Sequence, residues 1–416
     1  MSDSPDRFDI VCLSTNHWTG LPTSKQHLMS VLAESRRVLY VDPPIDVFST
    51  VGRRRRWPKL KGLRRVGDRL WVLSPVELSV RSDPDWRFAY YRKLSGRVRS
   101  ALGELGLSRP VVWSFSPEHA GCTTELDAAL TVYQAADEPA AKSPDPARTT
   151  DMEREHIAAS DVVLVASVAL LEARKSLGNV HRLPNAADRR HFTRVLAGRE
   201  DVTIDEFLEA VREPRTRPAA LGERRGPLVM FGGAAYSWFD WNLLWEVAEL
   251  RPDWSFALVG PVGGDVDRGR MPSNVTAVGR RSYEEFPWYV AASDVCVLPL
   301  RMNESSHNCD PIVMYECLLC GKPVVATPFP AALEHAGMVR TASSPGGFAA
   351  EIALALERDG TEESRRARAE FGFSCTWEDR AREAVRLIED AFSRRHSGPD
   401  GLGRDPATLD TDGAAP

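Results

Sequence analysis

The residues best suited to chemistry lie between Asn308 and Thr327, which read Asn-Cys-Asp-Pro-Ile-Val-Met-Tyr-Glu-Cys-Leu-Leu-Cys-Gly-Lys-Pro-Val-Val-Ala-Thr. Asp310 is a residue type that caps helices, and Pro311 fits a first helical turn, where its missing N–H costs nothing. The unpaired N–H groups at 312–314 would then form a seat for a diphosphate. An ordinary capped helix with an exposed glutamate is the alternative interpretation.

Glu316 is the acidic residue of this segment, and it shares a helix face with Ile312, four positions earlier. It lies roughly 7 Å further along the helix axis than Pro311, about the step from a pyrophosphate to its ribose. A carboxylate there could accept hydrogen bonds from both ribose hydroxyls. Gly321 and Pro323 end the predicted helix, and Pro323-Val-Val-Ala predicts a buried parallel strand.

Gly232 and Gly233 close another predicted strand, and the absence of side chains would let a phosphate approach backbone N–H groups. The following loop, 234–239, contains no cation. Neutralisation of a diphosphate is therefore expected from helix termini and from Arg280, Arg281 or Arg301, of which the first two follow a later strand end. Simple surface solvation is the alternative for these arginines.

Polar residues also follow predicted strands in the first half of the chain, and functional groups on doubly wound sheets gather at the carboxyl ends of strands. His119 follows the strand at 111–115 and is expected to face a cleft, with a capping or structural role as the alternative. The candidates for contacts with a second substrate are Asn16, His17, Lys25, Asp137 and Asn185. Simple turn roles are equally open for Asp137 and Asn185.

The alternation of strands and helices predicts an α/β protein with two Rossmann-like, doubly wound domains facing across a cleft. The first domain is predicted at 1–212, followed by a linker at 213–226 that is rich in Pro, Arg and Gly, and by a second domain at 227–375. No G-x-G-x-x-G fingerprint is present, which disfavours a nicotinamide or flavin site. Residues 394–416 are rich in Gly, Pro, Asp and Ala and are predicted to be disordered.

Composition narrows the function classes. The chain has 416 residues and a net charge of −5, which argues against general nucleic-acid binding. No apolar run approaches the ~20 residues of a membrane span, and the polar N-terminus does not resemble a signal peptide. Seven cysteines, an odd number, favour a reducing cytoplasm. The helix predicted around Cys317 and Cys320 directs both thiols away from the 307–309 loop, so no metal site is expected.

A basic segment from Arg53 to Arg65 has two interpretations. It holds eight Lys and Arg residues in thirteen positions, interleaved with Trp57, Leu60 and Leu63. A solvated loop is one interpretation, and a patch that meets anionic lipid or an anionic acceptor is the other. The expected location is the cytoplasm, with possible peripheral contact at the inner face of the membrane.

The pattern Asn308-x7-Glu316 followed by Gly-Lys-Pro-Val-Val-Ala-Thr resembles the donor-site segment of retaining GT-B glycosyltransferases of family 4. Within that family it is most similar to bacterial teichuronic-acid and cell-wall sugar transferases. The family usually carries Glu-x7-Glu, and Asn308 replaces the first acid here. The resemblance covers most of residues 8–392 and implies a last helix, at 376–393, that crosses back to the first domain.

The resemblance also implies an activity: transfer of a sugar from a nucleotide diphosphate sugar to an acceptor hydroxyl or similar nucleophile, with retention and without a metal or other cofactor. Glu316 would hold the ribose. The glycine pair and the N–H groups of Ile312 and Val313, after Pro311, would hold phosphate. Asn308 and His119 would contact sugar hydroxyls as the residues closest to the reaction.

The acceptor could be a cell-envelope glycan, a lipid-linked sugar or a secondary metabolite. Two alternatives remain for the function as a whole. A non-catalytic GT-B homologue acting as a partner or scaffold would explain the altered position 308 and the cation-poor loop. A nucleotide-sugar epimerase of related fold would need acid and base carboxylates that the sequence does not assign.

Overall fold

The first of two parallel sheets is formed by the N-terminal half of the chain. The computed structural model describes residues 8–46, 62–222, 226–263 and 266–397. Among these residues the first sheet has eight strands, in the order β10-β9-β8-β7-β1-β2-β5-β4, and all neighbours are parallel except β4 and β5. The strands are β10 (Val180–Arg182), β9 (Val162–Val165), β8 (Leu130–Ala135), β7 (Val111–Ser114), β1 (Ile10–Leu13), β2 (Val38–Val41), β5 (Leu70–Leu73) and β4 (Leu63–Arg65).

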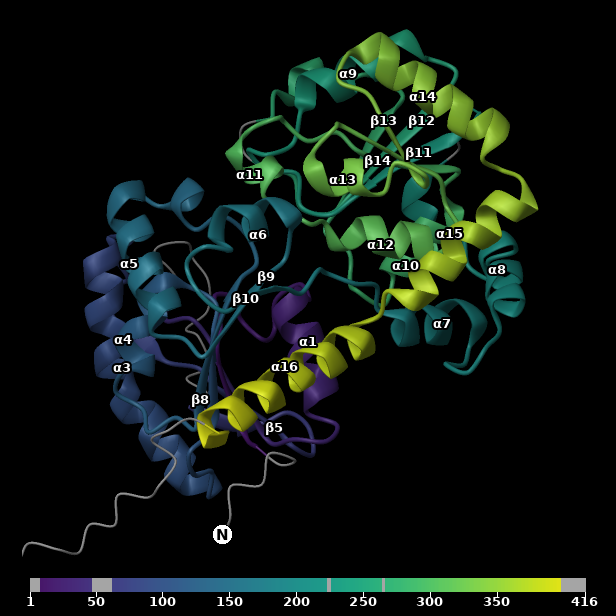
Figure 1. Ribbon diagram of the computed structural model, residues 1–416. Coiled ribbons are helices and arrows are strands. Elements are labelled where there is room, and N and C mark those ends of the chain that lie inside the picture. The colour runs from purple at the N-terminus through teal and green to yellow at the C-terminus, as the bar shows by residue number, and fades with distance from the viewer. Residues whose placement is uncertain (1–7, 47–61, 223–225, 264–265, 398–416) are drawn as a thin grey trace, which may run out of the picture.

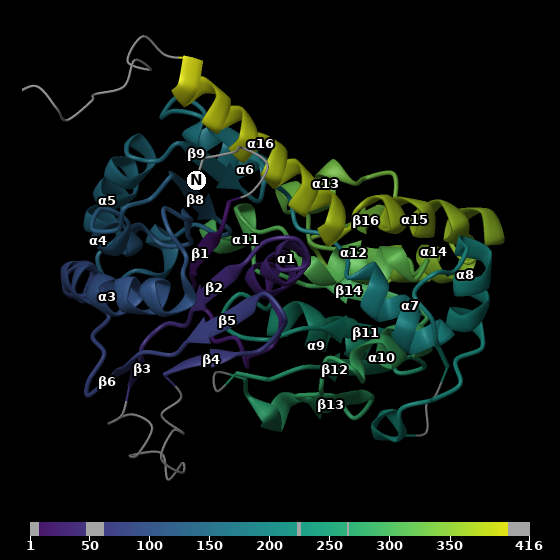
Figure 2. The ribbon, with the colours of Figure 1, turned by 90° about the horizontal axis from the view of Figure 1, so that it is seen from below.

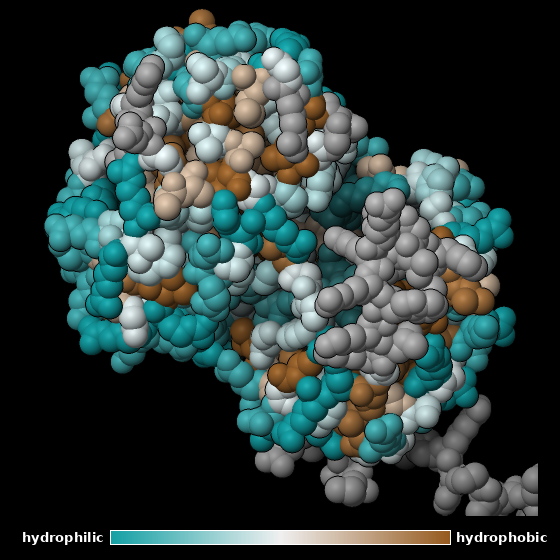
Figure 3. Space-filling model, turned by 180° about the vertical axis from the view of Figure 1, so that it is seen from behind, coloured by the Kyte–Doolittle hydropathy of each residue, from teal (hydrophilic) through white to brown (hydrophobic). Residues whose placement is uncertain are grey.

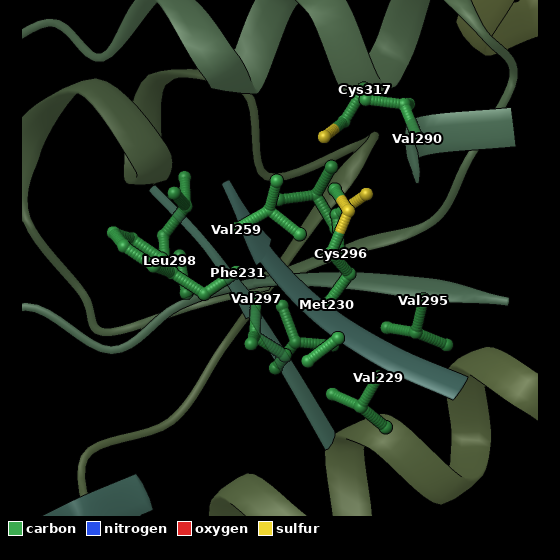
Figure 4. Packing of buried hydrophobic residues seen from close by; sticks show 14 of the residues in the cluster. Val229, Met230, Phe231, Val259, Val290, Val295, Cys296, Val297, Leu298 and Cys317 are labelled. Carbon is green, nitrogen blue, oxygen red and sulfur yellow. The ribbon is translucent and has the colours of Figure 1, made fainter. Parts of the chain in front are cut away.

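The second sheet has six parallel strands within the described part of the chain, in the order β13-β12-β11-β14-β15-β16. They are β13 (Val275–Gly279), β12 (Ser255–Val259), β11 (Leu228–Gly232), β14 (Val295–Leu298), β15 (Val324–Ala326) and β16 (Val339–Thr341). Figure 4 shows the apolar side chains of β11 and β14 packed in the middle of this sheet. Strands buried on both faces explain the continuous apolar runs in the sequence.

Helices cover both sheets, so the molecule has two α/β lobes, which Figure 1 shows side by side. The first lobe contains α1 (Ser24–Leu32), α3 (Pro84–Leu105), α4 (Ala120–Thr123), α5 (Pro146–Ala158) and α6 (Val168–Arg174). The second contains α9 (Trp241–Leu250), α10 (Phe286–Ala292), α11 (Glu304–His307), α12 (Ile312–Leu319), α13 (Pro330–Glu334), α14 (Pro345–Arg358) and α15 (Glu362–Ser374). A short strand pair, β3 (Ile45–Asp46) with β6 (Val76–Glu77), lies outside the two main sheets. The predicted α/β fold with two doubly wound sheets is confirmed.

The helix pair α7 (Arg189–Ala197) and α8 (Ile204–Arg212) packs with the second lobe. Phe192 and Phe207 are fully buried in the same apolar cluster as the second sheet, together with Leu196 and Val211. The sequence analysis placed these residues in the first domain because they precede the Pro-rich segment. Since a domain is defined by its own core, we propose that the second domain begins near Ala187 instead of at residue 227.

The last helix, α16 (Trp377–Ser397), joins the two lobes. It leaves the second lobe after α15 and lies along α1 on the first lobe, as both ribbon views show (Figures 1 and 2). Trp377, Leu387 and Ile388 are buried in the core cluster of the first sheet. The helix thus runs past the predicted end at 393, and residues 398–416 of the predicted tail lie outside the described residues. No helix in the described part of the chain is long and apolar enough to cross a membrane.

Candidate functional site

A cavity of about 460 Å³ lies between the two lobes. From behind, the space-filling view shows a hollow between the lobes (Figure 3). The second lobe lines the cavity with the ends of β11, β12 and β14, the residues after β13, and the start of α12. The first lobe lines it with the loop after β1, the start of α1 and the residues after β8. Most of the segments chosen from the sequence therefore meet at one place, at the carboxyl ends of parallel strands.

The start of α12 forms one end of the second-lobe wall. Pro311 is the N-cap residue, and the N–H of Met314 already donates to the Pro311 carbonyl, at 3.1 Å. The N–H groups of Ile312 and Val313, whose residues line the cavity, have no partner within the helix. The predicted anion-binding position at 312–314 therefore offers two N–H donors instead of three. The helix dipole adds positive potential at the same place.

The C-terminal end of α12 has the predicted geometry. Gly321 adopts φ +66°, and its N–H donates to Leu318 O at 2.8 Å while the N–H of Lys322 donates to Cys317 O at 3.0 Å. This pair of bonds is a Schellman motif, which glycine favours because it has no Cβ to clash. This motif ends α12 at Leu319, so Glu316 lies in the last turn of the helix.

Glu316 lies in the cavity lining but is only 4% exposed. The Tyr283 hydroxyl donates to its Oε1 at 2.9 Å. Burial raises the pKa of Glu316 to about 8; the Tyr283 hydrogen bond opposes the shift, and the charge of Asp188 adds to it. No pattern in the sequence indicates Tyr283, because Tyr283 and Glu316 come from separate segments and only the fold brings them together.

The glycines at the end of β11 leave space in the wall of the cavity, and the N–H of Gly233 is not free. A Cβ on Gly232 would lie 2.6 Å from the Phe286 ring and 3.2 Å from Val313. The N–H of Gly233 is bonded to Val259 O at 2.9 Å, so the expectation that its N–H faces a phosphate is wrong. Gly233 has φ +130°, a conformation that residues with a Cβ rarely adopt.

Arg280 and Arg281 both line the cavity, as expected from their position after β13. The Arg281 guanidinium donates from Nη2 to Val278 O at 3.0 Å, which holds its side chain against the strand end. These are the cations that the second lobe brings to the cavity among the described residues. Asp240 caps α9 and accepts from Leu243 N at 3.0 Å.

The first-lobe wall contains Asn16, Lys25 and Asp137, three of the predicted contacts for a second substrate. Lys142, which the sequence analysis did not select, also lines the cavity and donates to Asp137 at 2.6 Å. Lys25 is only 6% exposed, and its ammonium lies 5.1 Å from the centre of the Phe115 ring. This wall is therefore built from charged side chains.

Asn185 and Asp310 connect the two walls. The N–H of Asn185 donates to Asp310 Oδ2 at 2.7 Å, and the Asn185 amide donates to the Asp310 carbonyl. Tyr315 donates to the other carboxylate oxygen of Asp310 at 2.9 Å. Burial raises the pKa of Asp310 to about 6, and the two hydrogen bonds oppose that shift. The sequence predicts that Asp310 caps α12. In the structure Asp310 instead connects the two lobes through its bonds with Asn185.

Three predicted site residues do not line the cavity. His119 is fully buried; its Nδ1 accepts from Phe115 N at 3.2 Å and its ring packs edge-on against Tyr91. Burial also lowers the pKa of His119 well below its usual value, so the ring is neutral. The role of His119 in contacting a sugar is therefore wrong in this conformation, because the backbone turns the ring into the first-lobe core.

Asn308 and His17 are the other two predicted site residues that do not line the cavity. Asn308 ends α11, and its amide donates to Glu304 O at 3.0 Å. The predicted contact of Asn308 with a sugar is corrected accordingly, because α11 uses the side chain to satisfy its own last turn. The His17 ring is 43% exposed and lies 3.9 Å from the Asp42 carboxylate.

An aromatic cluster behind Glu316 also spans the lobes. Tyr283 stacks on His191 with ring centres 4.2 Å apart, and His191 Nε2 lies 2.9 Å from Tyr283 O. His27 of α1 stacks on Trp377 at 5.2 Å and lies 3.3 Å from Asp188. His27 thus packs at the junction of α1, α16 and the second lobe.

No group of three or more His, Cys, Asp or Glu residues with a metal-binding arrangement occurs in the described ranges. Cys317 and Cys320 are fully packed in the core of the second lobe, where burial raises their pKa values well above the usual thiol value. The basic segment at 53–65 falls mainly outside the described residues; its last residues belong to β4, and membrane contact through this segment stays a prediction.

Comparison with known proteins agrees with this geometry. Residues 227–358 match the family of glycosyl transferases group 1. The TuaH protein of Bacillus subtilis, named as a teichuronic acid biosynthesis glycosyltransferase, is 32% identical over 148 residues, which cover 33% of this chain and 37% of TuaH. The aligned region thus spans little more than a third of that relative.

Solved structures match over nearly the whole chain. Sucrose-phosphate synthase from Thermosynechococcus elongatus has a TM-score of 0.67 and 15% identity, covering 93% of this chain and 100% of the other. The catalytic domain of starch synthase IV from Arabidopsis thaliana, bound to ADP and acarbose, has a TM-score of 0.62 and 12% identity over 93% and 100% of the two chains. HepE from Anabaena, in complex with UDP and glucose, has a TM-score of 0.58 and 16% identity over 94% and 100%. The chain therefore has the two-lobed GT-B fold of these structures, and residues 227–358 of its second lobe match the glycosyl transferases group 1 family.

Proposed function

We propose that the protein transfers a sugar from a nucleotide diphosphate sugar to an acceptor nucleophile, with retention of the anomeric configuration. The observation that carries this proposal is the arrangement along α12. Two unpaired N–H donors at its start and the Glu316 carboxyl group about one turn later line the same cavity. A diphosphate and its ribose span a similar step.

The state of the carboxyl groups supports retention assisted by the leaving group. Among the described residues that line the cavity, Asp137 is paired with Lys142, Asp310 is bonded to Asn185, and Glu316 is buried under Tyr283. None of these groups is a free general base. Deprotonation of the acceptor by departing diphosphate oxygens needs no such base, whereas the alternative epimerase would need free acid and base carboxylates.

The negative charge that develops on the leaving diphosphate requires fixed positive potential. The start of α12 supplies two N–H donors, and Arg280 and Arg281 supply formal charges from the same wall. Gly232 keeps the intervening space free of a side chain. In this proposal these groups bind and orient the diphosphate, and Glu316 accepts from the ribose hydroxyls after Tyr283 yields its hydrogen bond.

Thermal-shift measurements with UDP, GDP, TDP and ADP test the donor site directly, because a ligand that binds the folded state raises its melting temperature. We expect at least one nucleotide to stabilise the protein. Glu316→Ala should abolish that shift, whereas the control Glu249→Gln, an exposed carboxylate on α9, should keep it. An unchanged shift in Glu316→Ala would show that the ribose contact is wrong.

A non-catalytic GT-B homologue is the second candidate. It is motivated by the corrections at Asn308 and His119, whose side chains do not reach the cavity although the resemblance implied sugar contacts for both. Transfer and hydrolysis assays on a panel of nucleotide sugars separate the two candidates. Tight nucleotide binding with no turnover of any donor would favour the scaffold.

A further inference from the structure

Lys25 lines the first-lobe wall of the cavity and has no hydrogen-bond acceptor among the described residues. Its side chain is buried, with only 6% of the residue exposed. Its ammonium makes no hydrogen bond or ion pair with any described residue, and lies over the Phe115 ring at 5.1 Å. A buried ammonium without an acceptor is unfavourable, so this position is suited to a ligand that supplies one.

Asp137, the carboxylate whose charge acts on Lys25, is already paired with another lysine. Asp137 accepts from Lys142 at 2.6 Å, and it acts on Lys25 only at longer range. Burial lowers the pKa of Lys25, and the negative charge of Asp137 opposes this shift. A second negative charge placed in the cavity beside Lys25 would stabilise the ammonium further.

The start of α1 adds a second source of positive potential at the same place. Thr23, Ser24 and Lys25 all line the cavity, and the N–H of Thr23 is bonded to Gln26 Oε1 at 3.0 Å. The N–H groups of Ser24 and Lys25 lie in the first turn of a nine-residue helix, where no intrahelical partner exists. Unpaired N–H groups, the helix dipole and a buried ammonium together favour an anion.

We propose that this wall, formed by Ser24 and Lys25, is an oxyanion site that binds a phosphate or carboxylate group of the acceptor. The inference rests on the proposed function and specifies its second substrate. The donor diphosphate has its own seat on the other lobe, at the start of α12 with Arg280 and Arg281. An anionic group held on the opposite wall would orient an acceptor hydroxyl toward the sugar, so the acceptor class is a sugar phosphate, a phosphate-linked glycan or a uronic acid.

Binding can be measured by thermal shift on the full chain in the presence of saturating UDP, or of whichever nucleoside diphosphate binds. The probes are inorganic phosphate, glucose 6-phosphate and glucuronate, with glucose and sodium chloride as the neutral and ionic-strength controls. We expect the anionic sugars to bind on the order of tenfold more tightly than glucose, since a charge-assisted hydrogen bond contributes about that factor.

Two matched pairs of variants locate the site. Lys25→Met should remove the preference for anionic sugars, whereas Lys93→Met, an exposed lysine of α3, should keep it. Ser24→Pro removes one N–H at the first helical position, where proline is tolerated, and the extended conformation of Thr23 (φ −126°, ψ 177°) suits a following proline. Ser24→Pro should weaken the preference, and Ser24→Ala, which keeps the N–H, should not. The Ser24 pair gives an answer even if Lys25→Met does not fold.

The outcomes separate this inference from the proposed function. Failure of every nucleoside diphosphate to bind would contradict the proposed donor site. Normal nucleotide binding with no preference for anionic sugars would overturn the oxyanion site alone. A loss of nucleotide affinity in Lys25→Met, with acceptor probes unaffected, would instead assign Lys25 to the donor diphosphate and would also overturn the proposal.

Discussion

The second-lobe wall of the cavity offers backbone N–H groups at the start of α12 beside two arginines, whereas the first-lobe wall offers lysine and aspartate side chains beside the start of α1. In the second lobe, glycines leave room and the start of α12 offers N–H groups. In the first lobe, Lys25, Asp137 and Lys142 present charges from separate segments. Backbone donors suit a diphosphate, which is common to all nucleotide diphosphate sugars. Side chains can change without altering the fold, so the first-lobe wall is the place where acceptor specificity is expected.

The largest effect on stability is expected from a substitution of Gly260, which lines the second-lobe wall. A Cβ on Gly260 would lie 1.9 Å from Gly233 O, and Gly260 has φ +148°, so Gly260→Ala should lower the free energy of unfolding by about 3 kcal/mol or more. Gly279→Ala is the matched control, because its φ is +77° but no atom lies within 4 Å of the added Cβ. Its expected loss is about 1 kcal/mol. Urea unfolding measures both, and equal losses would contradict the steric account.

Tyr283→Phe tests how the second-lobe wall holds the Glu316 carboxyl group. The variant leaves the Glu316 carboxyl without its hydrogen bond, so the free protein should lose about 1–3 kcal/mol of unfolding free energy. Nucleotide binding restores a partner to Glu316, and the affinity should therefore rise roughly threefold to tenfold. Isothermal titration with UDP or the preferred nucleotide measures the change. A weaker affinity would mean that the phenol stays bonded in the complex.

The pH dependence of stability tests the state of the same carboxyl group. Because the pKa of Glu316 is about 8 in the folded protein, against its ordinary value of 4.5, the folded state binds more protons than the unfolded state between these values. The contribution of Glu316 to the unfolding free energy should therefore be fully present at low pH and be lost as pH rises toward 8. Glu316→Gln lacks this dependence, so the difference between wild type and variant isolates it. A difference that stays constant or grows with rising pH would contradict the assignment.

The smallest effect is expected for the exposed ion pair of the first-lobe wall. The Lys142 and Asp137 side chains are 53% and 49% exposed, so Lys142→Met should change the unfolding free energy by less than about 1 kcal/mol. Nucleotide affinity should stay unchanged, because the pair belongs to the wall opposite the proposed donor seat. A clear loss of nucleotide binding would contradict the division of the cavity into a donor wall and an acceptor wall.

Local patterns predicted the second-lobe wall better than the first. The stop at Gly321 and the strand after Pro323 depend on residues within a few positions of each other, and both are present in the structure. Asp310 was misjudged because its partners, Asn185 and Tyr315, are set by packing between lobes. The position of His119 just after a strand was compatible with either direction, and the local turn directs its ring into the core.

The sequence by itself determined the order of strands and helices, the two-lobed α/β fold and the helix that begins after Pro311, because these follow from apolar periodicity and from the chemistry of glycine and proline. The tertiary structure decided which side chains share the cavity. Tyr283 over Glu316, Lys25 over Phe115 and the α7–α8 pair in the second core are contacts between segments far apart in the chain. Such contacts depend on how whole elements pack against one another, and no local pattern of residues encodes them.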